Sequence, residues 1–187
     1  MKKNQRAFTL IELLVTISIL SVLLMLAAPS FVDFHRSSTL TSQVNNLVSA
    51  LHMARNEAIK HNTHSYLVPL ANNSWSSGWM LFADTDMSGV YEEANDSKIL
   101  EYPHFSDQLE LTANGNTAND TSARYISFNA SGYPRTKANA MANFSMAITV
   151  SGAATDANTR RIIVSKTGRI RTCRPDTDST CTSNASD

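Results

Sequence analysis

The chain has 187 residues, which is enough for one domain with a hydrophobic core, or for one such domain and an anchor. Its 16 Lys and Arg residues balance its 16 Asp and Glu residues, so the overall charge favours neither a nucleic-acid-binding protein nor an acidic tail. The mean hydropathy of −0.20 is typical of a soluble protein, but this average conceals one long apolar segment near the N-terminus.

The first predicted element is a membrane-spanning helix. The segment from Phe8 to Ala28 is apolar, and as a helix it is long enough to cross a hydrocarbon core of about 30 Å. Lys2, Lys3 and Arg6 precede this segment, and no basic residue follows it before Arg36. The positive-inside rule therefore predicts a cytoplasmic N-terminus and an exported remainder. An ordinary secretory signal has a shorter apolar region with a cleavage site after it.

Glu12 lies inside this apolar segment. A carboxylate within a spanning helix is costly and is functional by default, although a glutamate so close to the helix end can also reach the membrane interface. The residues AFTLIE from Ala7 to Glu12 resemble the class III signal of type IV pilins and pseudopilins. The family usually has glycine at the position of Ala7.

This resemblance implies how the N-terminus is processed and used. A prepilin peptidase would cleave between Ala7 and Phe8, remove residues 1–7 as a leader peptide and methylate the new amine of Phe8. Glu12 would then be an assembly contact, because its charge can pair with the N-terminal amine of a neighbouring subunit and so offset two burial costs. Pro29 matches a proline that bends or loosens the helix in this family.

The second predicted element is the amphipathic continuation of the helix over residues 29–62. Apolar residues recur at helical spacing and form one stripe, which needs a partner such as a β-sheet. We expect the helix to run to about His61, with Asn62 as its stop. The stripe consists of Leu40, Val44, Leu47, Leu51, Ala54 and Ala58.

A β-rich domain is predicted over residues 63–187, because short β-type runs alternate with clusters of turn residues and no helical period returns. The predicted fold class is α+β, with a long N-terminal helix packed on an antiparallel sheet or sandwich. The runs are Ser65–Pro69, Trp79–Phe82, Lys98–Tyr102, Leu109–Leu111, Arg124–Phe128, Phe144–Val150, Arg161–Val164 and Arg169–Cys173.

Two further segments resemble one branch of the pilins, the FimT/GspH-type minor pilins and pseudopilins. The helix end from Leu51 to Lys60 is similar to that branch's LxxARxEAIxR pattern, and the segment from Gly78 to Asp84 is similar to its GWxxFxD strand. The resemblance covers nearly the whole chain and implies a pilin-like fold, with other pilins as partners.

Most kinds of chemical site find little support in the sequence. The segment from Asp84 to Gly89 matches the first half of a calcium loop, but Asn95 replaces the glutamate that completes such a loop, so a plain hairpin turn is the favoured alternative. His61 and His64 have no evident third ligand. Without a phosphate-binding loop or a catalytic triad, we predict no enzyme activity, no cofactor and no metal.

The two cysteines, Cys173 and Cys181, fit no common zinc pattern. In an exported protein they predict a disulfide that closes a small loop, whereas in a reducing cytosol two free thiols would be expected.

The strongest charge signal lies beside them. No acidic residue occurs between Asp156 and Asp176, yet this interval contains six basic residues. Lys166 to Gly168 is predicted to be a turn, after which Arg169 and Arg171 point to one face of a strand. Guanidinium groups bind phosphate oxygens in bidentate fashion, so the cluster indicates salt-sensitive binding to phosphates, independent of base sequence. The alternatives are a strand edge protected from aggregation and a contact with other subunits.

The residues GRIR from Gly168 to Arg171 resemble the GRxR motif of FimT minor pilins, which bind DNA in natural transformation. The resemblance implies a subunit held in the bacterial inner membrane, with its C-terminal domain in the periplasm, that later joins an extracellular pilus and binds DNA. The alternative is a structural subunit of a pilus or of a type II secretion pseudopilus that does not bind DNA. The predicted DNA-binding residues are Lys166, Gly168, Arg169, Arg171 and Arg174, supported by Arg160 and Arg161.

Overall fold

The computed structural model describes residues 8–71, 74–103, 105–115, 125–152 and 155–182, without the side chains of 26–30, 114 and 115. The chain divides into two compact units, Met1–Ser38 and Thr39–Asp187, and each is described by itself. The helix α1 (Leu10–His61) has residues in both. The predicted leader 1–7, with Ala7 at its cleavage site, lies outside the described residues.

In the first unit, Thr9 and Glu12 cap the start of α1. The backbone N–H and the hydroxyl of Thr9 donate to Glu12 Oε2 at 2.8 and 2.9 Å, and the Glu12 N–H donates to Thr9 Oγ1 at 3.3 Å. This reciprocal pair is a capping box, so Glu12 stabilises the helix start within its own chain. Sequence reasoning assigned Glu12 to assembly and missed this local role.

Across the described part of the chain, no helix has both the length and the apolar character that crossing a membrane requires. The side chains of residues 26–30 lie outside the description. These residues include the end of the anchor predicted over 8–28 and Pro29, the proline predicted to bend the helix.

In the second unit, α1 ends as its sequence predicts. Asn62 has a left-handed φ of 51°. The N–H of Asn62 donates to Ile59 O at 3.3 Å, and that of Thr63 donates to Ala58 O at 3.1 Å. These two bonds form a Schellman motif, which satisfies carbonyl groups that the end of a helix would otherwise leave unpaired.

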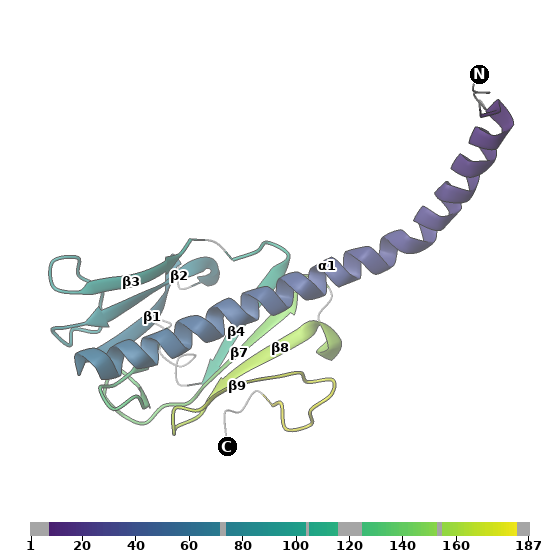
Figure 1. Ribbon diagram of the computed structural model, residues 1–187. Coiled ribbons are helices and arrows are strands. Elements are labelled where there is room, and N and C mark those ends of the chain that lie inside the picture. Colours follow the sequence, from purple (N-terminus) through teal and green to yellow (C-terminus); the bar gives the residue numbers. More distant parts are fainter. Residues whose placement is uncertain (1–7, 72–73, 104, 116–124, 153–154, 183–187) are drawn as a thin grey trace, which may run out of the picture. The chain divides into compact units, whose positions relative to one another are not determined.

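Two antiparallel sheets form the rest of this unit (Figure 1). The first has the order β3-β2-β1-β5-β6 and the second the order β4-β7-β8-β9. The first sheet contains β1 (His64–Ala71), β2 (Ser74–Asp84), β3 (Ser97–Tyr102), β5 (Ile126–Phe128) and β6 (Pro134–Arg135). The second contains β4 (Leu109–Gly115), β7 (Phe144–Val150), β8 (Thr159–Val164) and β9 (Ile170–Cys173), and the short 3-10 helix η1 (Asp156–Asn158) precedes β8.

The apolar stripe of α1 and both sheets share one core. All six stripe residues are buried, and within this unit α1 crosses in front of strands from both sheets (Figure 1). Ser65 Oγ donates to Ala54 O at 2.7 Å and so joins β1 to the helix. Trp79 stacks on Tyr102 with ring centroids 4.4 Å apart. The predicted α+β class, with a helix packed on antiparallel strands, is confirmed.

The strand predictions need corrections at several boundaries, since β1, β2, β3, β4 and β8 extend beyond the runs predicted for them. The two-residue strand β6 was not predicted, because two residues show no alternation. Arg124, where one predicted run begins, lies outside the described residues. The last predicted run begins at Arg169, but β9 begins at Ile170, because Arg169 still belongs to the preceding turn.

Candidate nucleic-acid interface

The turn between β8 and β9 carries two of the predicted cationic side chains. The strands pair up to Val164 and Ile170, and the Gly168 N–H donates to Ser165 O at 2.9 Å while the Ser165 N–H donates to Arg169 O at 3.0 Å. Gly168 has a left-handed φ of +81°, a conformation that favours glycine. Lys166, two residues before Gly168, and Arg169, directly after it, are exposed.

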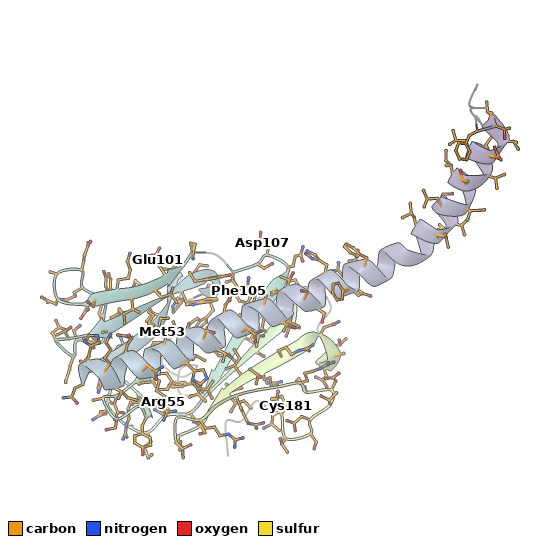
Figure 2. The ribbon with its side chains drawn as sticks, viewed as in Figure 1. Met53, Arg55, Glu101, Phe105, Asp107 and Cys181 are labelled. Atoms are coloured by element: carbon orange, nitrogen blue, oxygen red, sulfur yellow. A yellow bond between two sulfur atoms is a disulfide. The ribbon has the colours of Figure 1, made fainter. Side chains whose placement is uncertain are left out.

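The helix holds this turn in place through Arg55. Arg55 Nη1 donates to the carbonyl oxygen of Gly168 at 2.9 Å. A Cβ atom on Gly168 would lie 2.6 Å from the carbonyl oxygen of Gly132 and 3.3 Å from Arg55 Cζ. Figure 2 labels Arg55 on the part of α1 that reaches this turn. Gly168 therefore serves as a close backbone contact, and its carbonyl oxygen already has a partner.

Arg55 was not among the predicted site residues. It stands in the segment from Leu51 to Lys60 that resembles the FimT/GspH branch, and this was the only signal available. Its side chain also lies against Gly132, where an added Cβ would be 3.0 Å from Arg55 Nε. Two glycines and one arginine thus fix the base of the turn, although they come from three distant segments.

Lys166 and Arg169 have side chains that are free to bind a ligand. Within the described part of the chain, neither side chain takes part in an ion pair or a hydrogen bond. A cation that is already unpaired does not need to break a protein contact before it binds a phosphate. These two residues are therefore the most accessible phosphate ligands of the predicted set.

Arg171 and Arg174 are already paired with acids. Arg171 Nη1 lies 3.7 Å from Asp178 Oδ2, and Arg174 donates to both carboxylate oxygens of Asp176 at 3.1 and 2.8 Å. The hydrogen bond from Arg174 holds the pKa of Asp176 below its ordinary value. The basic stretch contains no acid in sequence, but two of its arginines contact carboxylates from the loop that follows β9.

A disulfide closes the loop that carries these acids. Cys173 and Cys181 are bonded, with Cα atoms 5.7 Å apart, which confirms the predicted pairing. The bond joins the end of β9 to the segment after Asp178, which lies beside Arg171, whereas Asp176 is only two residues from its partner Arg174.

Arg160 and Arg161 lie on opposite faces of β8. Successive side chains of a strand point to opposite faces, and Arg160 lines a cavity of about 410 Å³ with Arg174 and with Val44 of α1. Burial, together with the positive charge of Arg174, lowers the pKa of Arg160. Arg161 pairs in register with Cys173 on the opposite face. Lys166 and Arg169 therefore differ from the other four cations, since Arg171 and Arg174 are paired with acids and Arg160 and Arg161 lie on opposite faces of β8.

In the acidic turn after β2, backbone N–H groups of the turn bind the carboxylate of Asp84. The Asp84 side chain is buried and accepts hydrogen bonds from the N–H groups of Ser88 and Gly89 at 3.1 and 2.9 Å. Burial raises the pKa of Asp84. One carboxylate oxygen each from Asp84, Asp86 and Asp96 lies within 4.8 Å of the others. The segment joins the antiparallel pair β2 and β3, as expected of a hairpin connection.

The chain resembles known proteins both in sequence and in fold. Residues 43–168 match the family described as type II transport protein GspH, and residues 2–28 match the prokaryotic N-terminal methylation motif. No curated protein matches the chain.

Solved structures show the same fold. The type IV minor pilin FimU of Pseudomonas aeruginosa strain PAO1, in two crystal forms, is 20% identical, with TM-scores of 0.53 and 0.55 over 76% and 80% of this chain and 99% of that chain. The minor pseudopilin EpsH from the type 2 secretion system of Vibrio cholerae is 15% identical, with a TM-score of 0.51 over 72% of this chain and 96% of that one.

Proposed function

The chain belongs to the GspH family of type II transport proteins, and from this premise we propose that it is a minor subunit that binds DNA through the turn between β8 and β9. The family, the methylation motif and the fold of FimU and EpsH support a minor type IV pilin or pseudopilin role. The DNA-binding task is the specific part of the proposal. We assign the chain a binding role instead of a catalytic one.

We also propose a route to the filament. Cleavage between Ala7 and Phe8 and methylation of Phe8 by a prepilin peptidase agree with the motif over residues 2–28. Before assembly, the subunit is held in the inner membrane with its C-terminal domain in the periplasm. It then enters an extracellular filament, where Glu12 pairs with the amine of a neighbouring pilin.

The DNA-binding proposal rests on one observation: on a turn held by Arg55, the side chains of Lys166 and Arg169 have no ion-pair or hydrogen-bond partner among the described residues. Lys166 and Arg169 are exposed, and the Arg55 bond at 2.9 Å holds the backbone between them. A rigid turn loses little conformational entropy when a ligand binds. Lysine and arginine both bind phosphate oxygens, and such contacts position a protein on DNA without reading its sequence.

Additional phosphate contacts come from the four other arginines of the basic stretch, Arg160, Arg161, Arg171 and Arg174. Arg171 and Arg174 reach phosphates after they exchange Asp178 and Asp176 for DNA. Contact with two phosphates through the turn alone gives a weak complex, and each arginine released from its acid adds to the affinity and to its dependence on salt.

The test is a titration of fluorescent DNA with the full chain in a neutral detergent, repeated at several salt concentrations. The variant is Lys166→Gln with Arg169→Gln, and the matched control is Lys137→Gln, an exposed lysine elsewhere in the same unit. We expect the double variant to bind at least about tenfold more weakly, with a log–log salt slope shallower by about 0.9 for each lost contact. No binding at low salt, or equal binding by the double variant, would refute the proposal.

A second candidate function is a purely structural role in a type II secretion pseudopilus. The observations that favour it are the GspH match over residues 43–168 and the fold shared with the pseudopilin EpsH. In that case deletion of the gene would abolish secretion, and the Lys166→Gln/Arg169→Gln variant would restore it fully. Restoration of secretion together with an absence of DNA binding would favour this candidate.

A further inference from the structure

We infer that the same surface prefers single-stranded DNA, with the ring of Tyr133 as a stacking platform for a base. This inference rests on the proposed DNA-binding function and goes beyond it, because it names the form of the nucleic acid and a residue outside the basic stretch.

Tyr133 occupies a rigid loop between β5 and β6. Its N–H donates to Asn129 Oδ1 at 2.9 Å, and its carbonyl oxygen accepts from the Asn129 N–H at 3.0 Å. The Gly132 N–H also donates to Asn129 O at 2.8 Å. The backbone that carries the ring is therefore fixed before any ligand binds.

The ring itself is open to solvent. Tyr133 is 42% exposed, and among the described residues of Thr39–Asp187 it is the only exposed Phe, Tyr or Trp. The other aromatic rings of this unit lie in the core or in ring clusters, such as Trp79 with Tyr102 and Tyr66 with Phe82. Tyr133 takes part in no ring pair within the described part of the chain.

The loop of Tyr133 lies directly against the cationic turn. Gly132 precedes Tyr133 and Gly168 precedes Arg169, and a Cβ on Gly168 would lie only 2.6 Å from the Gly132 carbonyl oxygen. Arg55 contacts both glycines. Tyr133 and Arg169 therefore extend from two backbone segments that touch, and both side chains are exposed.

This combination suits a strand whose bases are unpaired. Cations bind the phosphates of either form of DNA, but an aromatic ring gains stacking energy only from a base face that is not covered by the neighbouring base pairs. Tyrosine stacking does not depend on the base, because every base has a π-face. The surface would thus combine backbone contacts from Lys166 and Arg169 with one stacking contact from Tyr133.

The test compares a fluorescent thymidine 20-mer with a duplex of equal length, using the full chain in a neutral detergent. The variants are Tyr133→Leu, which removes the ring, and Tyr133→Phe, which keeps it. The matched control is Met87→Ala, which removes another exposed apolar side chain. We expect tighter binding to the single strand, and a loss of about 5- to 150-fold for that ligand alone in Tyr133→Leu. Duplex binding, and both ligands with Tyr133→Phe, should stay unchanged.

The outcomes separate this inference from the proposed function. If neither DNA binds, the proposed function itself fails. If both bind and Tyr133→Leu affects neither, the function stands and the stacking platform is refuted. Equal weakening of both ligands by Tyr133→Leu would also overturn the inference, because a distorted turn, and not a lost stacking contact, would then explain it. An equal unfolding temperature in all variants checks that each is folded.

Discussion

Replacement of Gly168 by alanine should destabilise the protein more than the same change at Gly152, and the structure provides the reason. Both glycines have a left-handed backbone, with φ of +81° at Gly168 and +73° at Gly152. Among the described residues, a Cβ on Gly152 would meet nothing within 4 Å, whereas a Cβ on Gly168 would lie 2.6 Å from Gly132 O. The pair thus separates steric overlap from backbone strain.

The magnitudes follow from these two terms. A side chain in the left-handed region costs about 1–2 kcal/mol. Alanine also lowers the entropy of the unfolded chain, which partly offsets this cost, and the offset is equal at the two sites. Gly152→Ala should therefore cost about 1 kcal/mol or less. Gly168→Ala adds an overlap between backbone atoms, which relaxes only if the turn moves, and overpacking of this kind costs about 1–3 kcal/mol more.

Urea unfolding followed by tryptophan fluorescence measures this difference, because Trp75 and Trp79 are both buried in the core of the same unit. Gly168→Ala should also weaken DNA binding, since Arg169 moves with the turn, while Gly152→Ala should bind normally. If the two variants lose stability equally, to within about 0.5 kcal/mol, the contact between Gly132 and Gly168 does not constrain the turn.

Two further predictions concern charge. Asp178→Asn should free Arg171 from its partner at 3.7 Å, which raises DNA affinity several-fold and makes the salt slope steeper by about 0.9. The cost in stability should be small because the pair is near the surface. Unchanged affinity and slope would mean that Arg171 does not reach DNA. Burial, together with the charges of Asp84 and Tyr125, raises the pKa of Tyr66 from 10.0 to about 12, so its contribution to stability is complete below pH 10 and is lost as the pH rises towards 12. Tyr66→Phe should remove this part of the alkaline loss, as measured by unfolding midpoints between pH 8 and 12, and an equal loss in both proteins would contradict the assignment.

The architecture could be predicted because its signals are local. The stripe from Leu40 to Ala58 repeats at the helical period and is buried over its whole length, and Asn62 ends the helix with a left-handed residue. The run Phe144–Val150 coincides with β7. The order of the strands could not be predicted in this way, because β4 pairs with β7 and β1 with β5, and such long-range pairing leaves no periodic trace in either strand.

The candidate site was predictable as a composition but not as an arrangement. The sequence indicates a turn at Lys166–Gly168, since glycine and a short polar run mark it, but it predicts Arg169 on the following strand, whereas β9 begins at Ile170. It does not indicate that Asp178 returns to Arg171, because that contact lies within the loop that the disulfide closes. Nor does it reveal that Arg55 binds Gly168, a residue 113 positions away.

The family match covers only part of the residues that the proposed function uses. The match covers residues 43–168, so it includes Arg55, Gly132 and Gly168, which together fix the turn. It stops immediately before Arg169, and the arginines and the disulfide loop that follow lie beyond it. The match includes Lys166 and Tyr133 of the proposed binding surface but not Arg169, and its description names transport, not DNA binding. For this reason the family supports the role as a filament subunit, and only measurements on Lys166, Arg169 and Tyr133 can decide whether that subunit binds DNA.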